Sequence, residues 1–397
     1  MAATGAGFAT IYTYPWDLHD EGIDAAFRTI VETAGIRDVS LALSYHYATY
    51  FLPHNPVRPI YFGEHGAVYF QPQAERYSRT TLRPQVSSLV RGPEYLSDIV
   101  AGARSAGVRL SPWIPYCFNQ LLPKTFPHAA RRDALGNLYL SHLCPVNADV
   151  REYFRALTAD VVAQSSADGL MIESLSFLRF DYGFWNPKVL TPISPRCGLL
   201  LGLCFCPDCL ATGQAGGVDS EALRAEIAAY LRAELPRIPS PGDLAPASEE
   251  WIAEAFDGKL AAFLAARAER TTALFEEIVQ VAREHGASHV QTVLPTRASQ
   301  PVSGLIPERV WPLIDRPMVG LPTEPVEPTI RRLRESLPAS SQLLVSLHPA
   351  QFESEGKLIE VVQRARAAGA AGFTFYNYGL IRQEHLRWIG AASRAWR

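Results

Sequence analysis

The stretch Val150–Ser174, VREYFRALTADVVAQSSADGLMIES, decides the fold of this chain. Its first two thirds place apolar residues three and four positions apart, as on one face of a helix. Its last part, Gly169–Ser174, is a short apolar run that is typical of a buried strand and ends in an acidic and a polar residue. The stretch therefore predicts a helix that leads directly into a strand, which is the repeating step of a parallel α/β protein.

The same strand signal recurs along the chain, and several of these runs are followed by helical sequence, for example at 258–285 and 328–337. Eight strands that each lead into helical sequence predict an α/β fold of the (β/α)8 TIM-barrel class. The predicted strands are Phe8–Thr13, Val39–Tyr45, Val108–Ile114, Gly169–Ser174, His289–Leu294, Pro317–Leu321, Leu343–Leu347 and Gly372–Tyr376.

We expect residues 1–397 to form a single barrel domain with insertions after strands 2 and 4, because a TIM barrel needs only roughly 250 residues. Residues 55–75 alternate around a glycine-containing turn and are rich in tyrosine and phenylalanine, which predicts an aromatic hairpin. Residues 178–256 form the second insertion, and they contain a cysteine cluster and a segment rich in proline, glycine and serine.

The composition excludes several classes of partner. Thirty-seven Lys and Arg stand against 40 Asp and Glu, so the chain has no excess of positive charge with which to bind nucleic acid or an anionic membrane. No apolar run has the length of a transmembrane helix, and the N-terminus does not have the pattern of a signal peptide. We therefore expect a soluble, cytoplasmic protein. No glycine-rich phosphate-binding motif follows a strand, so we expect no nucleotide cofactor.

Three of the six cysteines, Cys204, Cys206 and Cys209, lie close together in the sequence. Such density indicates reduced thiols around a metal rather than a disulfide framework. Tetrahedral zinc needs a fourth ligand, for which Cys144 and Cys197 are the candidates. Four thiolates leave no open position for water, so the predicted zinc is structural.

Three segments around these residues resemble the central part of the family 42 β-galactosidases and of related glycosyl-hydrolase-like barrels. They are HLCPVNADVREYFRALTADVV, DGLMIES and LCFCPDCL, which begin at His142, Asp168 and Leu203. The resemblance implies that Glu173 takes the place of the acid/base residue. It also implies that the zinc ligands are Cys144, Cys204, Cys206 and Cys209.

The chain departs from the family pattern at two places. Ile172 replaces the asparagine that precedes the glutamate. The seventh strand is followed by His348 and Pro349, so no carboxylate stands where the family has its nucleophile. These departures favour a barrel that binds carbohydrate without hydrolysing it.

Catalytic residues of a TIM barrel lie at the C-terminal ends of the strands. Glu173 ends an apolar strand, where burial raises the pKa of a carboxyl group as a general acid requires. Glycoside hydrolysis usually needs a second carboxylate. The candidates for it are Glu324, which is the best placed, and Asp181, Glu353 and Glu355 in longer loops. His348 is a candidate base or hydrogen-bond donor to substrate.

Aromatic residues crowd the same strand ends. Sugars present apolar C–H faces framed by hydroxyl groups, so rings beside His, Asn and Arg side chains suit them. The predicted substrate-binding residues are Tyr12, Trp16, Tyr45, His46, Trp113, Asn119, Arg179, Tyr376 and Asn377. The expected partner is a carbohydrate.

The sequence leaves three functions open. The first is a glycoside hydrolase, in which Glu173 protonates the leaving oxygen and Glu324 attacks the sugar or activates water. The second is the non-hydrolytic carbohydrate-binding barrel. The third is a sugar lyase or isomerase in which Glu173 and His348 move a proton next to a carbonyl group. The sequence does not define the sugar, the linkage or the oligomeric state.

Overall fold

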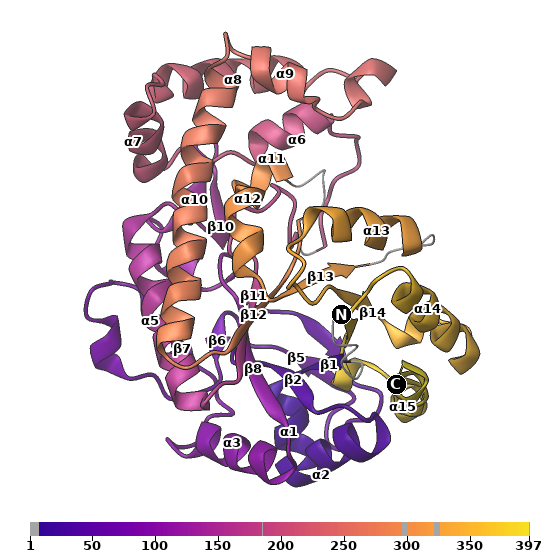
Figure 1. Cartoon of the computed structure of the whole chain (residues 1–397). Coiled ribbons are helices and arrows are strands. Elements are labelled where there is room, and N and C mark those ends of the chain that lie inside the picture. The colour runs from indigo at the N-terminus through magenta and orange to yellow at the C-terminus, as the bar shows by residue number, and fades with distance from the viewer. Residues whose placement is uncertain (1–7, 185, 296–299, 321–325, 397) are drawn as a thin grey trace.

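Eight parallel strands close into a barrel, which confirms the predicted (β/α)8 class (Figure 1). The computed structural model describes residues 8–396 apart from 185, 296–299 and 321–325. Each of the eight predicted runs overlaps one barrel strand, with bounds that differ by at most a few residues. In order around the barrel these strands are β1 (Phe8–Thr13), β2 (Asp38–Ala42), β8 (Arg109–Pro115), β11 (Gly169–Glu173), β12 (His289–Val293), β13 (Arg316–Gly320), β14 (Leu344–Leu347) and β15 (Gly372–Phe375).

Strand β11 lies between β8 and β12 and shows why the apolar runs become strands. Leu170, Met171 and Ile172 are all buried, because one face of a parallel barrel fills the interior and the other packs under helices. The register pairs Glu173 with Pro115 of β8. The acidic side chain therefore stands at the C-terminal rim of the barrel.

Helices surround the barrel and most of them follow a strand (Figure 1). The helix of the opening stretch, α5, is capped by Asn147, whose side chain accepts a hydrogen bond from the Val150 amide at 3.0 Å. The helices around the barrel are α1 (Pro15–Glu21), α2 (Ile23–Arg28), α3 (Tyr95–Ser105), α5 (Ala148–Ser165), α10 (Lys259–Glu284), α12 (Pro307–Val310), α13 (Val326–Ser336), α14 (Glu355–Ala367) and α15 (Gln383–Trp396). The short helix α11 (Gln300–Ser303) packs against the insertion after β11 instead. Across the described part of the chain, no helix is both long enough and apolar enough to cross a membrane.

The segment after β2 forms two small sheets instead of the predicted hairpin. Strand β5 (Ile60–Phe62) pairs antiparallel with β4 (Thr49–Phe51). Strand β6 (Ala67–Val68) pairs with β3 (Ser44–Tyr45) and β7 (Gln85–Val86). Burial alternates over Ile60–Phe62, but residues 66–70 are all buried, and the alternation in the sequence does not select the partner strand. Here the partners come from the flanking chain, on which the tyrosines of the segment pack.

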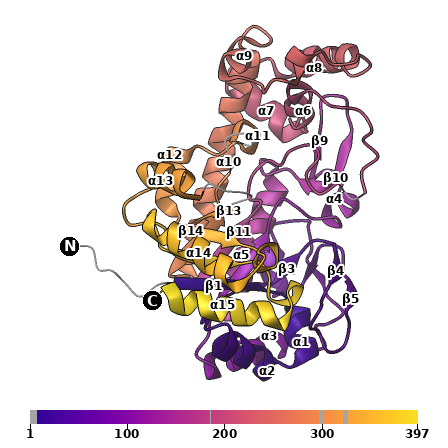
Figure 2. The same ribbon diagram turned by 90° about the vertical axis from the view of Figure 1, so that its right-hand side faces the viewer.

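Two excursions stand on the C-terminal side of the barrel (Figure 2). The one after β8 contains α4 (Leu122–Thr125) and the antiparallel strands β9 (Ala130–Arg132) and β10 (Leu138–Leu143). The one after β11 contains α6 (Pro195–Leu201), α7 (Pro207–Ala215), α8 (Ser220–Glu234) and α9 (Glu249–Glu254), and α10 leads from it back to the barrel. Its apolar residues gather around the cysteines in a hydrophobic core separate from that of the barrel.

Candidate functional site

Glu173 is the acidic group at the centre of the barrel mouth. Its carboxylate accepts hydrogen bonds from Trp113 Nε1 at 2.5 Å and from the Tyr182 hydroxyl at 3.5 Å. Burial raises the pKa of Glu173, and the two hydrogen bonds lower it only in part. The residue as a whole is half-buried at the barrel rim, and its carboxyl is biased towards the protonated form.

Aromatic rings from several strand ends surround this carboxyl. Trp113 lies edge to face against Tyr12 and Tyr45, with ring centroids 4.7 Å apart in both pairs. The Tyr376 ring is 5.4 Å from Tyr12 and 6.1 Å from Trp113. Tyr12, Tyr45 and Trp113 are buried, whereas Tyr376 is partly exposed. The structure thus brings four of the predicted substrate-binding residues together around Glu173.

Three tyrosine hydroxyls meet beside these rings. The Tyr14 hydroxyl donates to Tyr45 at 3.1 Å and lies 2.9 Å from the hydroxyl of Tyr376. The hydroxyls of Tyr45 and Tyr376 are 3.5 Å apart. Of the three tyrosines, Tyr376 is the most exposed.

Two histidines border the rings. His46 stacks on Tyr45 at 4.2 Å, and burial lowers its pKa to about 4, so it is neutral near pH 7. His348 is exposed, and its ring centroid is 5.2 Å from that of Tyr376. A neutral imidazole donates one hydrogen bond and accepts one, as a sugar hydroxyl does.

Three other predicted substrate-binding residues have contacts typical of packing and capping. Trp16 is fully buried behind Tyr14, whose ring it stacks on at 4.3 Å. The Asn119 side chain accepts hydrogen bonds from the amides of Leu121, which caps α4, and Leu122, its first residue, at 2.9 and 2.8 Å. The buried Asn377 side chain accepts one from Gly379 N at 3.2 Å. Backbone amides at strand ends need such partners, which sequence reasoning did not weigh against sugar binding.

Arg179 and Asp181 form an ion pair with each other, with contacts of 3.0 and 2.7 Å. Arg179 is exposed and both residues line a cavity of about 960 Å³ beside the loop after β11. Glu324 lies outside the described residues. Glu353 and Glu355 are exposed. Among the described residues, no second carboxylate is close enough to Glu173 to shift its pKa.

Tyr182 is a functional candidate that the sequence did not reveal. Its backbone carbonyl lies 2.9 Å from His142 Nε2, and its ring meets Phe118 at 5.0 Å. Both partners come from the excursion after β8, where no strand was predicted. The only signal in the sequence was the position of Tyr182 beside Asp181, in the loop that follows Glu173.

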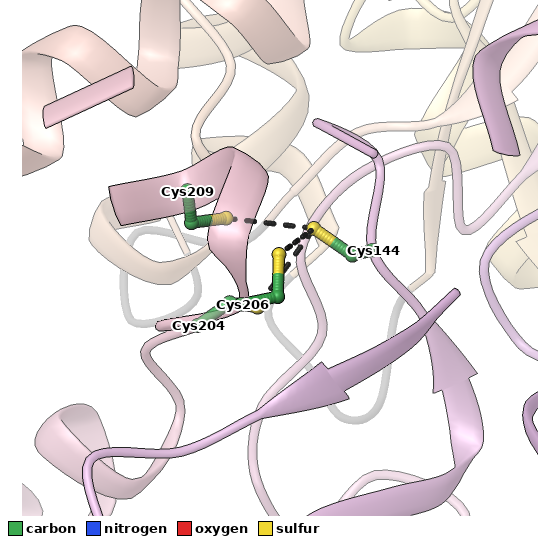
Figure 3. Close-up of side chains that lie close together, drawn as sticks. All are labelled: Cys144, Cys204, Cys206 and Cys209. Atoms are coloured by element: carbon green, nitrogen blue, oxygen red, sulfur yellow. Dashed lines mark hydrogen bonds between the residues drawn. The ribbon is translucent and has the colours of Figure 1, made fainter. Parts of the chain in front are cut away.

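The four cysteines Cys144, Cys204, Cys206 and Cys209 meet in the core of the insertion, as Figure 3 shows. All are buried, and the Sγ atom of Cys144 lies 3.5 to 3.8 Å from the other three. Zinc–sulfur bonds of roughly 2.3 Å at tetrahedral angles require sulfur atoms about 3.8 Å apart, whereas a disulfide requires roughly 2 Å. The thiols therefore fit one tetrahedral ion. Cys197, the other candidate ligand, is not in this group.

The fold and the site define a class of protein: a (β/α)8 barrel with a protonatable carboxyl group at the rim where TIM-barrel enzymes hold their catalytic residues. No protein-family model matches the sequence, and no curated protein does. Solved structures of glycoside hydrolases do match.

A β-galactosidase of the psychrophilic Marinomonas ef1 gives a TM-score of 0.58 at 11% identity, over 98% of this chain and 59% of its own. A catalytic mutant of a GH42 β-galactosidase from G. stearothermophilus gives 0.56 at 11% identity, over 99% of this chain and 57% of its own. The catalytic domain of a β-amylase from Paenibacillus polymyxa gives 0.54 at 12% identity, over 95% of this chain and 94% of its own. This chain thus spans less than two thirds of the length of these β-galactosidases, and the likeness shows a glycoside-hydrolase-like fold.

Proposed function

We propose that this protein is a glycoside hydrolase in which Glu173 is the general acid. The observation that carries the proposal is the half-buried carboxyl of Glu173, which stands among aromatic rings with its pKa raised by burial. A carboxyl group with a raised pKa keeps its proton to a higher pH and can transfer it to the leaving glycosidic oxygen. Proton transfer of this kind accelerates a reaction by roughly 10²- to 10⁴-fold.

A glycoside hydrolase must also bind a sugar next to its general acid, and the aromatic rings around Glu173 are suited to this. Tyr376 offers both a ring face and a hydroxyl, and His46 offers a neutral imidazole. We assign the second carboxylate, which attacks the sugar or activates water, to Glu324 because of its position after β13. The distance between the two carboxyl groups decides the stereochemistry, with about 5 to 5.5 Å for retention and about 6.5 to 9.5 Å for inversion.

A panel of aryl glycosides tests the proposal. The wild type should release the aryl group from at least one sugar, and Glu173→Gln should lose at least about 100-fold of that rate. Glu335→Gln is the matched control, because this exposed glutamate on α13 shares no contact with Glu173 and should leave the rate unchanged. No turnover by the wild type of any glycoside, or full activity of Glu173→Gln, would contradict the proposal.

A second candidate is the carbohydrate-binding barrel without hydrolysis. The observation that favours it is the end of β14, where His348 stands in place of a carboxylate. Calorimetric titration with monosaccharides separates the two functions, since binding without turnover in both wild type and Glu173→Gln supports the second. Exchange of solvent protons into a free sugar or uronate, without hydrolysis, supports a lyase or isomerase instead.

We also propose that Cys144, Cys204, Cys206 and Cys209 bind a structural zinc ion. The support is the donor set: four buried thiols whose spacing suits one tetrahedral ion and leaves no position for water. The ion would brace the insertion beside the barrel mouth. Elemental analysis of protein purified under reducing conditions should give one zinc per chain, and Cys204→Ser should lower this content. A wild type that neither contains nor takes up a divalent ion would contradict the proposal.

A further inference from the structure

Two arginines are buried in the same region without an acidic partner. Arg131 on β9 is 1% exposed and Arg267 on α10 is 0% exposed. Among the described residues, neither guanidinium forms an ion pair with a carboxylate, and each leaves two nitrogen atoms without a hydrogen-bond partner. The guanidinium carbons stand over the rings of Tyr139 and Phe177, both at 3.8 Å. A ring face offsets only part of the cost of a buried charge, so compensating negative charge is needed nearby.

The cysteine cluster is the group that provides it. The amide of Arg132, the neighbour of Arg131 on β9, donates to Cys204 Sγ at 3.5 Å. The guanidinium of Arg267 also lies 5.9 Å from the ring of Phe263, which stacks on Phe205 between Cys204 and Cys206. Burial lowers the pKa of both arginines, and interaction with the cysteines of the cluster raises it in part. One divalent ion bound by four thiolates carries two net negative charges, which two guanidinium groups neutralise. Four neutral thiols, or thiols joined as disulfides, would leave both arginines without compensation.

The same arginines contact the loop that follows Glu173. Arg131 Nη1 donates to the carbonyl of Leu178, and the guanidinium of Arg267 covers the ring of Phe177. The amide of Phe177 donates to the carbonyl of Ser303 at 3.0 Å, next to the Val302 carbonyl that accepts from Arg267 at 3.3 Å. This loop continues to Tyr182, whose hydroxyl meets Glu173.

We propose that Arg131 and Arg267 are the counter-ions of the metal–thiolate centre and that, through them, the centre holds residues 175–182, and with them Tyr182, in place beside Glu173. The inference rests on the proposed metal site. The two arginines are positioning residues: they touch neither the ion nor the reacting atoms. Because their charge is balanced only when the metal is bound, loss of the metal should loosen the loop of residues 175–182.

Release of metal tests the charge balance. Protein loaded with Co²⁺ shows thiolate-to-metal absorption, and its decay in excess chelator gives the release rate. Arg131→Met and Arg267→Met keep most of the side-chain volume without the charge, and each should release the metal at least about tenfold faster than wild type. The corresponding Lys variants keep the charge and should lie closer to wild type. Arg196→Met is the control, because Arg196 stacks on Trp251 at 5.2 Å in the same insertion.

Release rates of the Met variants equal to that of wild type would overturn the inference, as would Lys variants that behave like the Met variants. Hydrogen exchange of the wild type tests the coupling to the loop, also if a Met variant fails to fold. Chelation should increase exchange in residues 175–182, and unchanged exchange there would refute the coupling. A wild type that binds neither Co²⁺ nor Zn²⁺ refutes the metal site itself, whereas normal binding with indifferent variants refutes only the role of the arginines.

Discussion

The hydrogen bond from Trp113 to Glu173 should set the proton affinity of the proposed acid. The indole Nε1 donates to Oε2 at 2.5 Å, and this bond stabilises the carboxylate over the protonated form. A hydrogen bond to a charged group contributes about 1.5 to 3 kcal/mol, and the lower end applies because Glu173 is only half-buried. A difference of about 1.4 kcal/mol corresponds to a factor of ten in an equilibrium constant. In Trp113→Phe, the Glu173 carboxyl should therefore bind its proton roughly tenfold more tightly than in wild type.

Titration of the carboxyl groups by ¹³C NMR measures this effect without any knowledge of the substrate. The Glu173→Gln spectrum identifies the signal, and the midpoint in Trp113→Phe should move to higher pH. Trp16→Phe is the matched control: Trp16 belongs to the same ring cluster, stacks on Tyr14 and forms no hydrogen bond to Glu173. An unchanged or lower midpoint in Trp113→Phe, or an equal shift in the control, would refute the reasoning.

Three further outcomes are expected. Burial raises the pKa of Glu173 in the folded state, so this residue ionises first in the unfolded chain as the pH rises. The wild type therefore loses stability above about pH 4.3. Glu173→Gln should melt at a higher temperature than wild type at about pH 7, and this difference should vanish towards about pH 4. Asn147→Ala removes the cap of α5 and a 2.8 Å hydrogen bond to Asp208. It should lower the free energy of unfolding by about 2 to 4 kcal/mol in urea titrations. Asn147→Asp keeps the cap but places a second carboxylate next to that of Asp208. Tyr376→Phe should raise KM for a glycoside substrate more than it lowers kcat; the opposite pattern would remove Tyr376 from ground-state sugar binding.

The position of Glu173 was predictable, but much of its surroundings was not. Glu173 could be found because an acidic residue that ends an apolar strand of a TIM barrel must lie at the rim. Tyr182 could not be found in the same way, because its position depends on contacts with His142 and Phe118 from a different excursion. Trp16 illustrates the reverse case. It follows a barrel strand and has the right chemistry, but the small sheets after β2 fold over it and bury it completely.

The sequence by itself determined the eight-stranded barrel, the place of Glu173 on it and the residue types of the cysteine cluster. These follow from local patterns: apolar runs form strands, helical spacing forms helices, and close thiols indicate a metal. The residue pattern left both Cys144 and Cys197 open as the fourth ligand, and the structure brings Cys144 to the other three cysteines, as the family resemblance implied. The tertiary structure alone decided that residues 60–68 pair with flanking strands and that two arginines lie beside the cluster. The physical reason is that local patterns do not select the partner of a strand or of a buried charge. That choice depends on which segments the complete fold packs together.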